Sequence, residues 1–160
     1  MQTILVVDPD PDFLGWAQRH LEAPSARVIA AQDGEEALEL FASAKPDLII
    51  ADSVIGPFGG MGLLQRIRHQ DPNAFVILTS GFPSTTAIIE GMKYGAYEFL
   101  RKETLSFDLR TVVEGALKAK EAVEAAERRS KTPAPEANRQ PRDEIIGSSP
   151  AMQDVFKMIG

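Results

Sequence analysis

Five short apolar runs, most of them rich in β-branched residues, recur along the first hundred residues, and this repetition most limits the possible fold. The runs lie at residues 4–7, 27–31, 47–51, 75–79 and 97–100. Each run is four or five residues long, which is the length of a strand buried on both faces of a sheet. The chain is therefore predicted to contain five strands.

The segments between these runs carry apolar residues at the three- and four-residue spacing of a helix. They are Phe13, Trp16, Ala17 and Leu21; Ala37, Leu38 and Phe41; Leu63, Leu64 and Ile67; and Ile88, Ile89 and Met92. Strands that alternate strictly with helices are joined by right-handed crossovers. The predicted fold is therefore α/β, a doubly wound five-stranded parallel sheet with helices on both faces. Ligands of such sheets bind at the carboxyl ends of the strands.

A long final helix is predicted from about Ser106, a suitable N-cap, to about Arg129, with Asp108 in its first turn. A line of small and apolar residues follows this helix at heptad spacing. They are Leu109, Val112, Ala116, Ala119, Val123 and Ala126. Two interpretations remain open: an exposed amphipathic helix that continues off the domain, or a dimerising coiled coil.

Charge and composition divide the chain. Residues 1–127 carry 11 basic and 19 acidic side chains, whereas residues 128–143 carry 5 and 2 and include three prolines. We therefore predict a domain within residues 1–127, followed by a linker at 128–143. Residues 144–160 resume amphipathic spacing, and we expect them to begin a second domain.

The composition excludes several functional classes. The formal net charge of −6 argues against a general nucleic-acid binder, which needs clustered Lys and Arg. The absence of Cys and the presence of only two His exclude disulfide frameworks, thiol nucleophiles and zinc clusters. Apolar runs of about five residues are far shorter than the roughly 20 needed to span a bilayer. A cytoplasmic location without a membrane partner is predicted.

Reactive side chains follow the ends of the predicted strands. Asp8 and Asp10 follow the first strand, Asp52 the third, Thr79 ends the fourth, and Lys102 follows the fifth. At the shared edge of a parallel sheet these groups would lie close together. Neighbouring carboxylates oppose each other's ionisation, so they require a counter-charge. Carboxylate and carbonyl oxygens suit Mg²⁺, which is the predicted cofactor.

Other sites fit these residues less well. Asp10 and Asp12 flank a proline and match an N-cap and a first-turn acid, the favoured role for Asp12. A calcium loop is excluded because Phe13 and Arg19 stand where it needs Gly and Glu. The first strand is followed by acids instead of the glycines of a Rossmann or P-loop site. The glycines follow Asp52, where they allow a tight turn and close backbone approach.

The segments ILVVDPDPD, DLIIADSVIGPFGGMGLL, VILTSGF and GAYEFLRK, in this order, resemble the receiver domain of two-component response regulators over about residues 1–122. The resemblance implies a receiver domain at 1–122, followed by a helical extension and Pro-rich linker at 123–143. The resemblance implies a flavodoxin-like receiver fold in which Asp52 accepts a phosphoryl group from a sensor histidine kinase. It implies that Asp8 and the backbone carbonyl of Val54 help to hold Mg²⁺, together with Asp52 and, as a further candidate, Asp10.

The same resemblance implies roles for the remaining residues. Thr79 contacts the phosphoryl oxygen after activation, Lys102 pairs with it, and Phe99 turns inward when Thr79 moves. The domain would then be a regulatory phosphoacceptor and not an enzyme with a separate substrate. A homodimer is expected through helix 4, strand 5 and helix 5, or through the extended C-terminal helix.

The segment EIIGSSPAMQDVFKMIG, residues 144–160, resembles the start of the AAA+ ATPase domain of NtrC-like sigma-54-dependent transcriptional activators. The resemblance implies that the full-length protein joins the receiver to its own AAA+ domain and to a DNA-binding part. The fragment itself has no Walker motif, and we expect it not to contact DNA.

One departure from the receiver pattern leaves a second function open. Pro9 stands where the family usually carries a second acid that ligates the metal. The alternative is a pseudo-receiver that is not phosphorylated and serves as an interaction and dimerisation module. A small-molecule phosphatase of related topology fits less well, because no second catalytic acid follows soon after Asp52.

Overall fold

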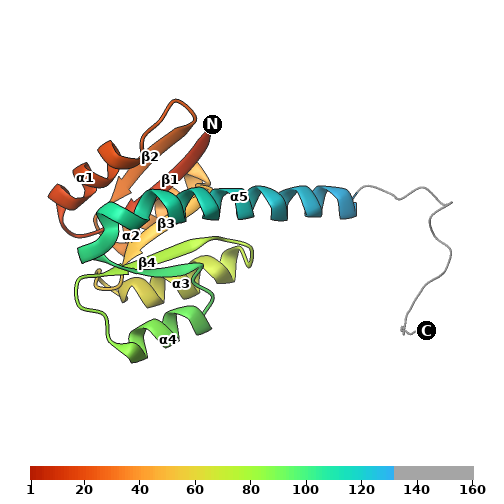
Figure 1. Cartoon of the computed structure of the whole chain (residues 1–160). Helices are drawn as coiled ribbons and strands as arrows, with labels where there is room; N and C mark the ends of the chain where they lie inside the picture. Colours follow the sequence, from red (N-terminus) through yellow and green to blue (C-terminus); the bar gives the residue numbers. More distant parts are fainter. Residues whose placement is uncertain (132–160) are drawn as a thin grey trace, which may run out of the picture. The chain divides into compact units, whose positions relative to one another are not determined.

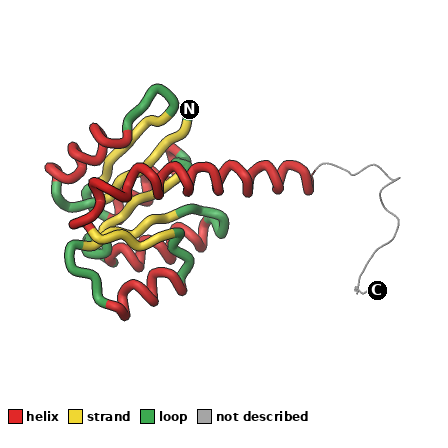
Figure 2. The backbone as a smooth tube through the Cα atoms, in the orientation of Figure 1, coloured by secondary structure: helices red, strands yellow, loops and turns green. Residues whose placement is uncertain are grey.

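The computed structural model describes residues 1–131, in which strands and helices alternate as the sequence predicts (Figure 2). The elements are β1 Gln2–Val7, α1 Pro11–Leu21, β2 Ala26–Ala31, α2 Gly34–Ala44, β3 Leu48–Asp52, α3 Gly59–Gln70, β4 Val76–Ser80, α4 Thr85–Lys93, β5 Glu98–Arg101, the 3₁₀ turn η1 Lys102–Thr104 and α5 Leu105–Lys131. All five predicted strands are present, and their observed ends differ from the predicted ones by at most two residues.

The five strands form one sheet in the order β2-β1-β3-β4-β5, and every neighbouring pair is parallel. The register pairs Val6 with Ile50 and Asp52 with Thr79. The chain passes from β2 back across β1 to β3, so crossovers run over both faces of the sheet. The predicted doubly wound α/β fold is confirmed.

Two apolar clusters cover the two faces of the sheet. Figure 1 shows helices on both sides of the strands. On one face, Leu14 of α1 and Leu109 of α5 pack with alternate strand residues such as Val6. On the other face, Ala37 of α2 and Leu64 of α3 pack with the intervening strand residues. Because side chains of a strand alternate between faces, strands buried on both sides read as continuous apolar runs.

Helix α4 packs differently from the other helices. Its one buried residue is Gly91, where an added Cβ would lie 3.0 Å from Leu78 and 3.1 Å from Phe99. The larger apolar residues Ile89 and Met92 remain 60% and 42% exposed. The helix predicted at this place is confirmed, but it approaches the sheet through its glycine and leaves much of its apolar surface outside.

The start of α5 differs from the prediction. The helix begins at Leu105 and not after an N-cap at Ser106. Leu105 already has helical backbone angles, φ −59° and ψ −34°, at the end of η1, so the 3₁₀ turn runs directly into the helix. Ser106 is therefore a helical residue, while the buried side chain of Leu105 anchors the first turn.

Part of the predicted heptad line on α5 is used inside the domain. Leu109 and Ala116 are 1% and 0% exposed and belong to the core between α5 and the sheet. Val113 and Leu117, which lie outside the heptad line, are buried beside them. The first half of the line therefore packs within the domain.

Residues Met1–Glu121 form one compact unit. The predicted linker from residue 132 onward and the predicted AAA+ segment at 144–160 lie outside the described residues. Within residues 1–131, none of the helices combines the length and the apolar character that crossing a bilayer requires.

Candidate phosphorylation site

Two carboxylates and one ammonium meet at the carboxyl ends of the strands. Nζ of Lys102 donates to Oδ2 of Asp8 at 2.5 Å and to Oδ2 of Asp52 at 3.0 Å. Asp8 is 0% exposed and Asp52 is 8% exposed. Lys102 is thus the direct counter-charge of both acids, as like-charged neighbours require.

The fold explains why these three residues meet. Asp8 directly follows β1, Asp52 ends β3, and β1 and β3 are neighbours in the sheet. Lys102 begins η1 immediately after β5, at the same end of the sheet. Residues separated by up to 94 positions in sequence therefore share one site.

Backbone amides orient the two carboxylates. Oδ1 of Asp8 accepts a hydrogen bond from the amide of Asp10 at 2.9 Å, and Oδ1 of Asp52 accepts one from the amide of Val54 at 3.1 Å. Each acid therefore presents one oxygen to its own loop and the other to Lys102. This leaves lone pairs on the carboxylate oxygens for a further ligand.

Thr79 lies beside Asp52 on the neighbouring strand, as its register partner. Thr79 is 1% exposed, and its Oγ1 has no hydrogen-bond partner within residues 1–131. A buried hydroxyl left in this way costs about 1–3 kcal/mol. The fold thus holds an uncommitted donor next to the Asp52 strand end.

The loop after Asp52 depends on two glycines. Gly59 has a φ of +76°, which favours glycine, and a Cβ on Gly60 would lie only 2.4 Å from the carbonyl oxygen of Asp52. The amide of Gly60 donates to the carbonyl of Ser53 at 3.0 Å. The glycines after Asp52 therefore permit the close backbone approach that the sequence predicts.

The acids after Asp8 cap helix α1. Oδ1 of Asp10 accepts a hydrogen bond from the amide of Asp12 at 2.9 Å, Pro11 begins the helix, and Asp12 lies in its first turn. Asp10 is exposed. In the described part of the chain, no three His, Cys, Asp or Glu side chains lie close enough together to hold a metal. The structure therefore places Asp10 in a capping role, apart from the Asp8–Asp52 pair.

Phe99 lies away from these groups. It packs with the cluster that contains Leu78 and against Gly91 of α4. Thr79 is two residues after Ile77 in β4, so its side chain lies on the opposite face of the sheet, the face that carries Ile77. Phe99 is partly buried between β5 and α4. The structure thus brings Asp8, Asp52, Thr79 and Lys102 to one place and leaves Phe99 across the sheet.

Phe13 is a site neighbour that sequence reasoning did not identify. Its ring centroid lies 4.4 Å from Nζ of Lys102. In the sequence, Phe13 reads as one of the apolar residues of a helix face. Nothing in its spacing distinguishes a ring below a lysine from an ordinary core residue.

Burial and pairing change the ionisation of Asp8 and Lys102. Burial raises the pKa of Asp8, and the hydrogen bonds from Lys102 and the Asp10 amide only partly oppose this. Burial alone would lower the pKa of Lys102, but its hydrogen bonds to Asp8 and Asp52, with their negative charges, raise it overall. The two directions are compatible because Asp8 is fully buried, whereas the Lys102 side chain is a quarter exposed.

Because the pKa of Asp8 is raised, we expect Asp8→Asn to increase the free energy of unfolding in a pH-dependent way. The charged form of Asp8 costs stability in the folded state, and Asn resembles the protonated form. The variant should match the parent well below pH 3.8, where Asp8 is protonated even in the unfolded chain. As pH rises through the folded pKa, the variant should become the more stable of the two. Urea unfolding from pH 3 to 8 measures the difference.

Exposed Glu39→Gln is the control for the loss of an acidic side chain elsewhere on the chain. An Asp8→Asn variant that loses stability relative to the parent as pH rises would contradict the assignment of Asp8 as a buried, costly charge.

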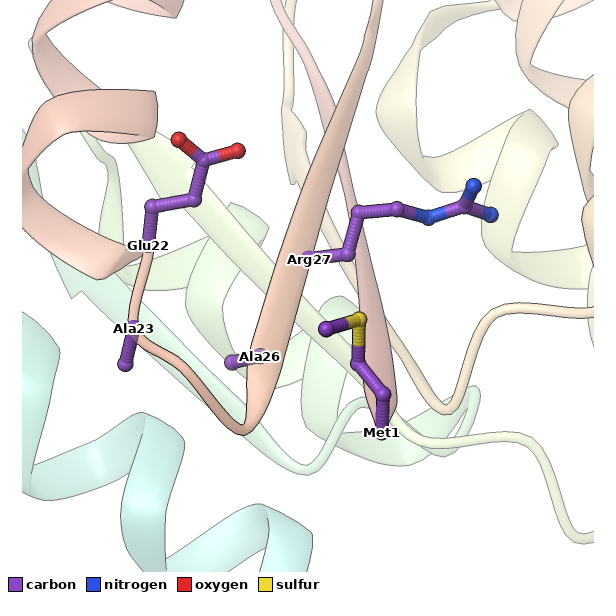
Figure 3. Close-up of a pocket in the computed structure, with 5 residues that line it drawn as sticks. All are labelled: Met1, Glu22, Ala23, Ala26 and Arg27. Atoms are coloured by element: carbon purple, nitrogen blue, oxygen red, sulfur yellow. The ribbon is translucent and has the colours of Figure 1, made fainter.

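Two surface pockets lie elsewhere. One has a volume of about 400 Å³ and is lined by Met1, Glu22, Ala23, Ala26 and Arg27. Figure 3 shows these residues. These residues adjoin the starts of β1 and β2, at the end of the sheet opposite the carboxylates. The second, of about 360 Å³, lies between the start of β1 and α5. Neither pocket contains a site residue.

Comparison with known proteins identifies relatives along nearly the whole chain. It is 29% identical over 157 residues to the DNA-binding transcriptional regulator NtrC of Escherichia coli K12, an alignment that covers 98% of this chain and 32% of NtrC. The chain spans about a third of the length of the curated relatives it matches.

Solved structures show the same fold. A response regulator receiver domain protein from Clostridium thermocellum superposes with a TM-score of 0.72 at 29% identity, covering 77% of this chain and 99% of that one. The response regulator protein TrrA from Thermotoga maritima, solved in complex with Mg²⁺-BeF, gives a TM-score of 0.65 at 27% identity, covering 72% and 99%.

Residues 4–114 match the family described as the response regulator receiver domain. The match covers more than half of the chain, and the relatives confirm the resemblance to NtrC-like regulators inferred from the sequence. The chain therefore belongs to the response regulator receiver domain family.

Proposed function

We propose that this domain is a phosphorylatable receiver in which Asp52 is the phosphoacceptor. The observation that carries the proposal is the bridge from Lys102 to both Asp8 and Asp52, since an ammonium lies beside the carboxylate that we propose as the nucleophile. A carboxylate is a modest nucleophile, and attack on phosphorus depends on neutralising the phosphoryl oxygens. The buried hydroxyl of Thr79 lies on the neighbouring strand.

The donor set fits Mg²⁺. Asp8 and Asp52 supply hard oxygen ligands with free lone pairs, and the Val54 carbonyl is the proposed third ligand. Mg²⁺ keeps several waters and binds few protein groups, so a site with two carboxylates suits it. Asp10, already engaged at the helix cap, would have to leave that role to contribute. When bound, the ion neutralises charge on the transferred phosphoryl group and helps to position the donor.

The protein groups have distinct tasks in the proposed reaction. Asp52 attacks phosphorus through one carboxylate oxygen, the bond to the donor's leaving group breaks, and an acyl phosphate forms. Lys102 keeps its charge at neutral pH, because its pKa is raised, and pairs with the phosphoryl oxygens. Thr79 donates its uncommitted hydroxyl to one of these oxygens. The modification adds about one negative charge and three acceptor oxygens at Asp52.

Movement of Thr79 toward the phosphoryl group is the proposed trigger for the output face. Phe99 of β5 lies against Gly91 of α4, on the face of the sheet opposite Thr79. A rearrangement of Phe99 would therefore change the surface of α4. Ile89 and Met92 are exposed on that surface, and exposed apolar groups of this kind favour a protein partner. We propose a homodimer through α4, β5 and α5, in equilibrium between two packings.

The wider setting follows from the NtrC-like resemblance. The proposed phosphodonor is a sensor histidine kinase, and the proposed target of the dimer is the protein's own AAA+ domain in a sigma-54-dependent activator. A cytoplasmic location suits both partners. The domain acts on its own Asp52 and has no separate substrate.

The test is incubation of the 160-residue chain with Mg²⁺ and acetyl phosphate, or with beryllofluoride. We expect a phosphoryl mass gain that maps to the peptide containing Asp52, and a beryllofluoride-dependent change in the NMR spectrum and in oligomeric size. Omission of Mg²⁺ should remove the response. A chain whose mass and spectrum do not change would contradict the proposal.

The pseudo-receiver alternative is favoured by Pro9, which is exposed and supplies no carboxylate. If Pro9 only weakens the metal site, Pro9→Asp should raise Mg²⁺ affinity by roughly tenfold to a hundredfold, since it adds a charged hard ligand. Isothermal titration with Mg²⁺ measures this. If the parent chain is not phosphorylated while the Pro9→Asp variant is, the pseudo-receiver alternative is established, and Pro9 is the reason that the parent is not phosphorylated.

A further inference from the structure

A row of aromatic rings on α1 begins at Lys102. The Phe13 ring lies 4.4 Å from the Lys102 Nζ, and its centroid is 5.7 Å from that of Trp16. Trp16 in turn stacks on His20 at 4.7 Å and 18°. Spacings of three and four residues place these side chains on one face of the helix.

The ring occupies a side of Lys102 that the carboxylates leave open. An ammonium has three N–H donors, and Asp8 and Asp52 accept two of them. A cation near an aromatic face is attracted by the ring quadrupole, more strongly where water is partly excluded. Since the Lys102 side chain is only a quarter exposed, this attraction restricts where its ammonium lies.

Phe13 itself is firmly held. It packs against the buried cluster between α1, α5 and the sheet, with Trp16 beside it. The far end of α1 is tied to α5, because Arg110 donates to the carbonyl of His20 at 2.7 Å. The residues flanking Lys102 give less support, since Arg101 and Glu103 form an exposed pair.

We propose that Phe13 is a positioning residue for Lys102: its ring holds the ammonium at the point where it meets Asp8 and Asp52. The kinetic consequence rests on the proposed phosphorylation of Asp52, whereas the geometry does not. Removing the ring leaves Lys102 free to sample positions from which it pairs less well with the phosphoryl oxygens.

Substitution tests the kinetic consequence. We expect Phe13→Leu to slow phosphorylation by acetyl phosphate in Mg²⁺ about tenfold, and Phe13→Tyr, which keeps the ring face, to stay within about threefold of the parent. The matched control is Phe75→Leu, because Phe75 packs partly buried against the same cluster but lies before β4, at the other end of the sheet.

A double-mutant cycle separates positioning from general destabilisation. In the Lys102→Met background, Phe13→Leu should cause no further loss of rate, because the ring then has no ammonium to position. A Phe13→Leu rate within about twofold of the parent, or an equal loss in both backgrounds, overturns the proposal.

NMR of the unmodified chain supplies a readout that does not need phosphorylation. The ε-methylene protons of Lys102 should be shifted upfield by the ring current of Phe13, and this shift should disappear in Phe13→Leu and persist in Phe75→Leu. Unshifted Lys102 protons overturn the proposal. If the parent chain is not phosphorylated, the proposed function fails, and the ring-current measurement alone decides the role of Phe13.

Discussion

Asp52→Asn should abolish phosphorylation by acetyl phosphate completely. The amide is not a nucleophile toward phosphorus, and it removes the acceptor oxygen of the acyl phosphate. The fold should survive, because Asn fills the same volume and its one carbonyl oxygen can keep one of the two hydrogen bonds that Asp52 accepts on separate oxygens, from the Val54 amide and from Lys102. Lys102 also keeps its hydrogen bond to Asp8. Intact mass measurement after incubation with Mg²⁺ and acetyl phosphate gives the result directly.

Asp33→Asn is the matched control for this substitution. Asp33 follows β2 at the same end of the sheet, but its Oδ1 caps α2 through the amide of Glu36 at 2.8 Å. Asn also caps helices, so this variant should fold and be phosphorylated as the parent is. Phosphorylation that persists in Asp52→Asn would place the acceptor on another residue.

Lys102→Met should have the second-largest effect. Loss of the ammonium that contacts both acids should slow phosphorylation by roughly 10²–10³-fold, the usual effect of removing one charged or hydrogen-bonding group from a transition state. Lys102→Arg should retain part of the rate, since the charge remains but the planar group cannot reproduce a compact ammonium between two carboxylates. Rates of mass gain at fixed acetyl phosphate measure both.

The same substitution should also destabilise the fold at neutral pH. Two buried carboxylates would lose their counter-charge, at a cost of about 1–3 kcal/mol, below the roughly 3–5 kcal/mol of a fully buried pair because Lys102 is partly exposed. Protonation of Asp8 relieves the repulsion, so the loss should shrink as pH falls. Adding Asp8→Asn to Lys102→Met should restore much of the stability.

Exposed Lys118→Met on α5 controls for the loss of a lysine elsewhere. It should leave both the rate and the unfolding midpoint in urea close to those of the parent. A Lys102→Met variant as fast as Lys118→Met would show that the bridge between Asp8 and Asp52 has no part in the reaction.

Local pattern determined much of this protein. Strands buried on both faces cannot avoid continuous apolar runs, and so the runs at residues 4–7 and 47–51 revealed β1 and β3. Because parallel strands end at one edge of a sheet, Asp8, Asp52, Thr79 and Lys102 were foreseeable as neighbours. The glycines after Asp52 were foreseeable too, since close backbone approach excludes a Cβ.

Tertiary packing decided what spacing leaves open. The apolar face of a helix does not reveal which neighbour covers it. Helix α4 packs through Gly91 and leaves Ile89 exposed, whereas Leu109 of the heptad line on α5, which fits either an exposed amphipathic helix or a coiled coil, is buried in the core. Ser106 appeared to be an N-cap only because sequence cannot show that η1 runs directly into α5.

The sequence therefore identifies the reactive groups, but it does not show that Lys102 pairs with both Asp8 and Asp52. Lys102 and Asp8 are 94 positions apart in the sequence. They meet because the strands pair in the order β2-β1-β3-β4-β5, and spacing along the sequence does not show this order. The ring of Phe13 below that lysine has the same cause. It depends on the packing of α1 against one face of the sheet, which no local periodicity encodes.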